Sequence, residues 1–327
     1  MTPLADAIAA AAERLAAAGV PSPRADAELL AGHVLVLGRG EVQARALAGA
    51  VLDDADATAF WDLVTRRAAR EPLQHLTGVA HFRGLTLGVG PGVFVPRPET
   101  EVVAQFAIDA LRSIPVAGRP STRSARSGNG IDARSGNGIG AHSGGGIGAR
   151  SGPGSREAVG PIAVDLGTGS GAIAIALATE VPHARVLAVE VSPDAFVWAK
   201  QNARAAAADN LTLVLGDLAH ALPELDGLVD VVVSNPPYIP TGAVPRDPEV
   251  RLHDPELALY GGEDGLDLVR ALDATARRLL RAGGSLVIEH GELQGDSIAR
   301  LLRASGWRAV ATHPDLTGRP RATTAIR

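Results

Sequence analysis

Residues 162–171 read IAVDLGTGSG, a short apolar run interrupted by Asp165 and followed by three glycines at alternate positions. Such a run is typical of a buried strand, and we predict that a helix begins at the glycines. The same strand–helix alternation continues to the end of the chain, which indicates an α/β fold built on a doubly wound sheet. The predicted strands are 162–166, 185–190, 211–215, 229–234, 285–290, 307–312 and 323–326, and the predicted helices lie near 171–180, 193–208, 265–281 and 294–304.

The glycine loop is interpreted as a ligand-binding turn, because glycine lets the backbone turn sharply and approach a ligand closely. Its G-x-G-x-G spacing differs from the G-x-G-x-x-G of dinucleotide sites, where a helix N-terminus faces a pyrophosphate. A ligand without phosphates can use the glycine backbone together with an acid that pairs with its ammonium group. S-adenosylmethionine has these parts, so we predict that it contacts Asp165, Gly167, Thr168, Gly169, Ser170 and Gly171.

Two further acids stand at predicted strand ends. Glu190 closes the second strand and can accept hydrogen bonds from both ribose hydroxyls. Asp217 follows the third strand and can accept from the adenine amino group. Three acids at three successive strand ends, with the glycine loop, indicate a cofactor site, and an NAD or nucleotide site is the alternative.

The end of the fourth predicted strand carries a second motif, VVVSNPPY at 231–238. The two prolines fix φ and remove two backbone donors, which leaves rigid carbonyl acceptors. The Asn235 side-chain oxygen and the Pro236 carbonyl can accept both N–H bonds of a planar NH2 group and orient its nitrogen toward a methyl donor, while Tyr238 stacks on the group. Catalysis then rests on positioning and electrostatics. We therefore predict methylation of an amide or amino nitrogen, with Asn235, Pro236 and Tyr238 as catalytic residues and Pro237 as part of the substrate site.

Three more segments accompany these two motifs: REPLQHLTG at 70–78, FVPRPETE at 94–101 and IEHG at 288–291. In this order and spacing, the five together closely resemble the PrmC/HemK family of peptide chain release factor glutamine methyltransferases. The resemblance runs from the N-terminal helices to the C-terminus and is interrupted only by a repeat-rich insert.

The resemblance implies a class I (Rossmann-like) methyltransferase fold that methylates the N5 amide of the glutamine in the Gly-Gly-Gln motif of class 1 release factors. In that family the glycine loop, the ribose acid and the residue after the third-strand acid contact the cofactor, which falls here on Gly167 to Gly171, Glu190 and Leu218. Asn235 to Tyr238 would take the glutamine, and Asn235 would also lie against the cofactor. Family members often carry an aromatic residue where this chain has Leu218, which implies aliphatic packing on the adenine.

The chain divides into four segments. Residues 1–78 show apolar residues at helical spacing and are interpreted as a helical release-factor-recognition domain. Residues 79–112 predict a β-hairpin, with strands at 81–87 and 93–95, followed by a helix that starts near Thr100. Residues 113–160 repeat a Gly-, Ser- and Arg-rich eight-residue unit that cannot bury enough apolar surface to fold. Residues 161–327 form the methyltransferase domain.

Some assignments remain open at this level. The repeats are either an arginine-rich tether to RNA or the ribosome, or a neutral expansion within a surface loop. Arg97, Glu99 and Glu101 either line the substrate entrance or anchor the hairpin to the following helix.

The composition narrows the class of protein. The chain has no cysteine, which excludes disulfides, thiolate metal sites and cysteine nucleophiles, and its nine histidines show no metal-ligand spacing, so we expect no metal. A net charge of -5 argues against direct nucleic-acid binding. The sequence shows neither a basic leader region nor an apolar run of about 18 residues. We expect a cytoplasmic monomer whose partners are class 1 release factors, without membrane contact.

Two other functions compete with this prediction. The same tetrapeptide can hold an exocyclic amino group of a base, as in an N-methyltransferase of DNA or RNA. A non-catalytic assembly factor could also keep the fold for binding alone. Methyl transfer to a release factor, to nucleic acid or to neither separates the three.

Overall fold

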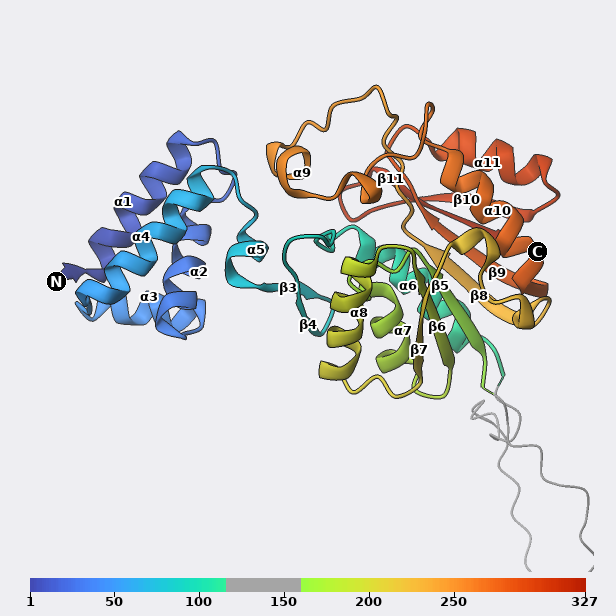
Figure 1. The fold of residues 1–327 in the computed structure, drawn as a ribbon, viewed down its shortest axis with the longest axis horizontal. Coiled ribbons are helices and arrows are strands. Elements are labelled where there is room, and N and C mark those ends of the chain that lie inside the picture. The colour runs from blue at the N-terminus through green and yellow to red at the C-terminus, as the bar shows by residue number, and fades with distance from the viewer. Residues whose placement is uncertain (116–159) are drawn as a thin grey trace, which may run out of the picture.

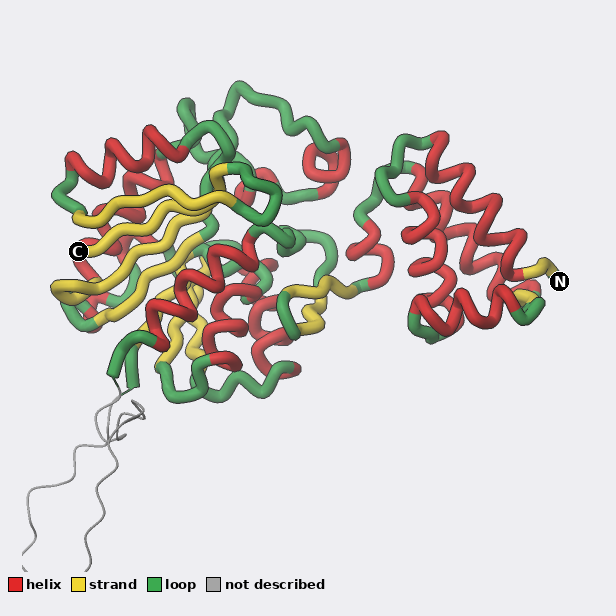
Figure 2. The backbone as a smooth tube through the Cα atoms, turned by 180° about the vertical axis from the view of Figure 1, so that it is seen from behind, coloured by secondary structure: helices red, strands yellow, loops and turns green. Residues whose placement is uncertain are grey.

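The computed structural model describes residues 1–115 and 160–327 and shows a helical unit beside a larger α/β unit (Figure 1). Most of the repeat segment, and with it the question of a tether, lies outside the described residues. Figure 2 shows that the two units are joined through a short helix and a hairpin. Within the described residues, no helix combines the length and apolar character that a membrane crossing requires.

The helical unit has a core of its own, which includes Leu4, Ile8, Leu30 and Phe60. Helix α2 begins with Pro23, whose missing N–H is harmless in the first turn. The last helix of the unit, α5, was not predicted. The elements of this unit are β1 (Thr2–Pro3), α1 (Leu4–Ala17), α2 (Pro23–Leu35), α3 (Arg39–Leu47), β2 (Val51–Leu52), α4 (Asp54–Ala68) and α5 (Leu73–Thr77).

The hairpin is present, but the predicted position of its turn was wrong. Strands β3 (Val79–Phe82) and β4 (Leu85–Gly88) pair antiparallel around a two-residue turn at 83–84. Arg83 has a φ of 53°, the left-handed conformation that a tight hairpin turn requires. Val93 and Val95 form no strand, and they pack in a separate cluster with Ala80 and Val89.

The α/β unit contains a seven-stranded sheet in the order β10-β11-β9-β8-β5-β6-β7. Strands β5 to β9 run parallel to one another, and β11 runs antiparallel to both of its neighbours, β9 and β10. The mostly parallel sheet is confirmed, and the predicted bounds of the first four strands are those observed. The strands are β5 (Ile162–Leu166), β6 (Arg185–Glu190), β7 (Leu211–Leu215), β8 (Val229–Ser234), β9 (Leu280–Glu289), β10 (Arg308–Pro314) and β11 (Pro320–Ile326).

Helices cover both faces of this sheet, because successive strand residues enter opposite cores. Ala163 and Val231 pack in the core with α6 and α7, whereas Val164 and Val232 pack in the core with α10 and α11. The helices of this unit are α6 (Thr100–Arg112), α7 (Ala172–Glu180), α8 (Pro193–Ala205), α9 (Pro248–His253), α10 (Asp267–Leu279) and α11 (Gly295–Ala304), with three-residue 3-10 turns η1 (Leu218–His220), η2 (Pro223–Leu225) and η3 (Glu256–Ala258).

The strand order reverses at β5, whose neighbours are β6 on one side and β8 on the other. Ligands of doubly wound sheets bind outside the carboxyl ends of the strands at such a point. The glycine loop follows β5 and the Asn-Pro-Pro-Tyr motif follows β8, and the Ser234 hydroxyl ties the two ends by donating to the Leu166 carbonyl at 2.6 Å. The fold therefore places both motifs side by side.

Candidate active site

A cavity of about 870 Å³ opens at these strand ends and brings most of the predicted site residues together. Both sequence motifs and the ribose acid contribute to its wall. The predicted residues that line it are Gly167, Thr168, Gly169, Ser170, Glu190, Leu218, Asn235, Pro236, Pro237 and Tyr238. Asp165, Gly171 and Asp217 do not line it.

Glu190 holds the glycine loop in place. Gly167 and Gly169 have φ of 76° and 58°, in the left-handed region that favours glycine. One oxygen of the buried Glu190 carboxylate accepts from the Gly169 N–H at 2.7 Å, and the other accepts from the Ser192 N–H at 2.8 Å. Each oxygen keeps a second lone pair, so the same carboxylate can also accept from ligand hydroxyls.

Asp165 lies beneath the loop, with 1% of its surface exposed. Its Oδ2 accepts from the Thr168 hydroxyl at 2.6 Å, whereas Oδ1 is buried without a hydrogen-bond partner. Burial raises the pKa of this carboxyl to about 7, against the lowering effect of the Thr168 hydrogen bond. A cation bound at the loop would favour the ionised form of this carboxyl.

The remaining predicted cofactor residues have different surroundings. Leu218 lines the cavity and packs against the core beneath it. Asp217 instead caps the 3-10 turn that follows, accepting from the Ala219 N–H at 2.9 Å. Gly171 has a φ of 85° immediately before α7, and a Cβ there would lie 3.0 Å from Ile175 Cδ1, so its role in the structure is to let the helix begin.

This side of the cavity suits S-adenosylmethionine better than a pyrophosphate. Asp165 and Glu190 would repel phosphate groups but attract an ammonium or sulfonium. The glycine backbone leaves room for an amino-acid tail, and Leu218 and Ile173 provide apolar lining. The residues present therefore fit the cofactor that the sequence predicts.

The backbone of the Asn-Pro-Pro-Tyr motif packs closely against residues that were not predicted from the sequence to belong to the site. A Cβ on Gly261 would lie 2.4 Å from the Pro237 carbonyl oxygen, and one on Gly265 would lie 2.3 Å from that of Tyr238. The Gln294 side chain also donates to the Tyr238 carbonyl at 2.9 Å. Only glycine permits this approach, so the motif is held rigidly from behind.

Tyr238 keeps a neutral ring at the cavity wall. Burial, and to a lesser extent the charge of the nearby Glu289, raise the pKa of its hydroxyl to about 12, against the lowering effect of Arg321. A neutral phenol offers a flat surface for stacking on a planar group.

Further cavity residues come from distant parts of the chain. Phe94, Thr100 and Arg321 line the wall, and only the first two belong to a segment that the sequence singled out. Arg97 and Glu99 also line it, whereas Glu101 accepts from the Arg83 N–H at 2.8 Å. The two alternatives for these three residues therefore apply to different members: Arg97 and Glu99 line the cavity, and Glu101 anchors the hairpin.

Residues 240–258, which we call the strap, form part of the wall of the cavity. The strap leaves and rejoins the domain where Ile239 pairs with Tyr260. Its contributions to the cavity wall include Pro245, Arg246 and Asp247.

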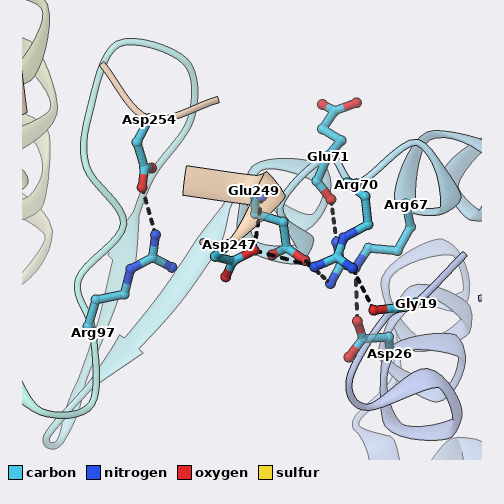
Figure 3. Close-up of polar contacts among 9 residues, drawn as sticks. All are labelled: Gly19, Asp26, Arg67, Arg70, Glu71, Arg97, Asp247, Glu249 and Asp254. Atoms are coloured by element: carbon cyan, nitrogen blue, oxygen red, sulfur yellow. Dashed lines mark hydrogen bonds and ion pairs between the residues drawn. The ribbon is translucent and has the colours of Figure 1, made fainter. Parts of the chain in front are cut away.

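Ion pairs attach the strap to two other parts of the chain (Figure 3). From the helical unit, Arg67 and Arg70 donate to the Glu249 carboxylate at 2.8 and 2.9 Å. Arg67 is itself buried and also pairs with Asp26 at 2.9 Å. On the other side, Arg97 donates to the buried Asp254 at 2.7 Å. The helical unit and the loop between β4 and α6 therefore both fix the wall of the cavity.

Comparison with known proteins agrees with the two-unit architecture. Residues 6–78 match the family model described as PrmC N-terminal domain, and residues 160–310 match that described as Methyltransferase domain. The chain is 48% identical to a protein of Streptomyces coelicolor named release factor glutamine methyltransferase, over 97% of this chain and 96% of that protein. It is 43% identical to a protein of the same name from Mycolicibacterium smegmatis, over 100% of this chain and 99% of that protein.

One relative carries a different name. A protein of Streptomyces pristinaespiralis, named 4-amino-L-phenylalanine/4-methylamino-L-phenylalanine methyltransferase, is 38% identical over 95% of this chain and 91% of its own length. That name describes methylation of an amino compound and not of a protein.

Proposed function

The chain belongs to the release factor glutamine methyltransferase family, and from this premise we propose that its cavity receives the side-chain amide of a release factor glutamine. The chain is an S-adenosylmethionine-dependent protein-glutamine methyltransferase that modifies the N5 nitrogen, and we assign the glutamine to the Gly-Gly-Gln motif. One observation carries the assignment of the site: Asn235 and the glycine loop line the same cavity at the reversal of strand order.

The chain's own residues would hold the cofactor by charge and by backbone contact. Asp165, beneath the loop, would attract its ammonium group by charge, Glu190 would accept from its ribose hydroxyls, and Leu218 would pack on its adenine. When bound, S-adenosylmethionine supplies a methyl group on a positively charged sulfur.

An amide nitrogen is a poor nucleophile, because its lone pair is delocalised into the carbonyl. The Asn-Pro-Pro-Tyr motif compensates by orienting that nitrogen. The Asn235 side-chain oxygen and the Pro236 carbonyl accept its two N–H bonds and orient the nitrogen toward the cofactor side of the cavity. Tyr238 stacks on the amide plane, and Pro237 keeps the segment rigid. These groups are positioned before the substrate arrives, so they act through orientation and electrostatics.

We also propose that the partners are class 1 release factors and that the chain acts as a cytoplasmic monomer without direct contact to nucleic acid. The net charge of -5 supports the last point, because phosphate binding relies on a basic surface.

The test is transfer of a labelled methyl group, followed by mass mapping of the modified residue. A release factor should be labelled at the glutamine of its Gly-Gly-Gln motif, and its Gln→Ala variant should not. Parallel reactions contain DNA, RNA or 4-amino-L-phenylalanine. Labelling of one of these in place of the release factor would overturn the proposal.

Glu249→Gln tests whether the strap must be fastened. The change removes the charge that two guanidinium groups share, and charge-assisted hydrogen bonds are worth about 1.5–3 kcal/mol each. We expect the KM for the release factor to rise by about tenfold, equivalent to roughly 1.4 kcal/mol, and hydrogen exchange across residues 240–258 to accelerate.

The matched control is Glu256→Gln, which changes an exposed carboxylate of the same strap. It should leave both the KM and the hydrogen exchange near those of the parent protein. An equal response to the two substitutions would mean that the contact with Arg67 and Arg70 does not hold the strap.

A further inference from the structure

Glu289 is a buried carboxylate beside the substrate motif that the mechanism above does not use. Parallel pairing of β8 with β9 aligns Ser234 with Ile288, so Asn235 and Glu289 are the next residues on the two strands. On its other side Glu289 pairs with Ala322 of β11. Only 1% of its surface is exposed, and burying an acid at this depth calls for an explanation.

The carboxylate is surrounded by groups of the active site. Its Oε2 is buried without a hydrogen-bond partner. Hydrogen-bonding groups of Thr100 and Asn235, the guanidinium of Arg321 and the carboxylate of Glu99 all influence the pKa of this acid. Tyr238, whose hydroxyl stays neutral, also feels its charge.

Asn235 needs such a neighbour, because an amide side chain has two ends of similar shape and opposite hydrogen-bonding character. Its Nδ2 points toward Thr100 Oγ1 at 3.4 Å. A carboxylate can only accept, so an ionised Glu289 favours the orientation in which Nδ2 turns toward it and toward Thr100. The Oδ1 atom is then left for the substrate.

We propose that Glu289 is a positioning residue: together with Thr100 it fixes the Asn235 amide so that Oδ1, and not Nδ2, meets the glutamine nitrogen. The inference rests on the proposed role of Asn235. If the amide were turned around, an N–H donor would face the N–H bonds of the substrate, and the orientation of the nucleophile would be lost.

The arrangement predicts a dependence on pH. Burial raises the pKa of Glu289 to about 7, although hydrogen bonds from Thr100 and Asn235 and the charge of Arg321 lower it. Below that pH the acid is protonated and can donate to Asn235 Oδ1, which stabilises the wrong orientation. The value of kcat should therefore rise with pH through an inflection at or below about 7.

Glu289→Gln tests the proposal while keeping the shape of the side chain. A glutamine can present either a donor or an acceptor, so we expect kcat to fall by about tenfold, as for the loss of one charge-assisted contact, and the acidic inflection to disappear. Cofactor affinity should be unchanged. In an Asn235→Ala background the same substitution should have no further effect on kcat, because coupled residues are not additive.

Thr100 provides a second, independent variant. Thr100→Val removes the hydroxyl and should lower kcat, whereas Thr100→Ser keeps it and should restore most of the activity. Equal losses from the two would indicate that Thr100 serves only packing and would count against the network.

Nuclear magnetic resonance gives a readout that does not depend on turnover. In the full chain with ¹⁵N-labelled asparagine, the side-chain amide signals of Asn235, assigned through Asn235→Ala, should shift with pH near 7, and Glu289→Gln should abolish the shift. An unchanged titration in Glu289→Gln would overturn the inference. Full activity of Asn235→Ala would instead overturn the proposed site, so the two failures are distinguishable.

Discussion

Asn235→Ala is expected to lower kcat for methyl transfer by about 10²–10³-fold, the loss that follows removal of one preorganised electrostatic partner of a reacting group. The substitution deletes the side-chain acceptor that orients the glutamine nitrogen and leaves the backbone of the motif unchanged. Affinity for the cofactor should change little, because Glu190 and the glycine loop remain intact. Single-turnover rates at saturating substrate, with calorimetric titration of the cofactor, measure the two effects separately.

Asn210→Ala is the matched control, since it removes an asparagine whose side chain donates to the Ala178 and Ala184 carbonyls. Asn210 does not line the cavity. Its loss should lower the melting temperature and leave the single-turnover rate unaffected. If Asn235→Ala behaved in the same way, the motif would have a structural role only.

Glu190→Ala is expected to weaken cofactor binding by about 10²-fold, because the carboxylate holds two backbone N–H groups and charge-assisted hydrogen bonds contribute about 1.5–3 kcal/mol each. The loss acts twice: the ribose loses its acceptor, and the loop loses the anchor at Gly169. The rate at saturating cofactor should fall much less than in Asn235→Ala. Calorimetric titration of the cofactor and thermal unfolding of the free protein measure both consequences.

Glu190→Gln should lie between the parent and Glu190→Ala. A glutamine oxygen can still accept from the Gly169 N–H, but its NH2 group cannot accept from Ser192. A cofactor affinity equal to that of the parent for Glu190→Ala would remove this residue from the cofactor site.

Much of the scaffold could be predicted because the relevant signals are local. Strands β5, β6 and β8 are buried on both faces, so they appear in the sequence as largely apolar runs, and Asp165, Glu190 and Ser234 stand at or near their ends. The signal of the glycine loop is equally local, since each glycine permits the backbone conformation at its own position. These features required no knowledge of distant contacts.

The rest of the site depends on contacts between distant segments. Arg321 reaches the cavity from the last strand in chain order, and the strap reaches it through ion pairs with a different unit. The hairpin shows a related difficulty: the run 81–87 contains a turn at Arg83–Gly84, which glycines further along the chain obscured. Asp217 follows a strand as predicted, yet its side chain caps a turn outside the cavity wall.

The insertion of β11 between β9 and β10 has a consequence for biosynthesis. A ribosome makes the chain in order, so β9 and β10 emerge before the strand that separates them. Until residues 320–326 are available, β9 has an unpaired edge next to Glu289, and exposed strand edges invite pairing with other chains. A product that stopped before Pro320 would lack strand β11, which lies between β9 and β10, and with it Arg321. We therefore expect prematurely terminated chains to aggregate and not to persist as weakly active enzyme.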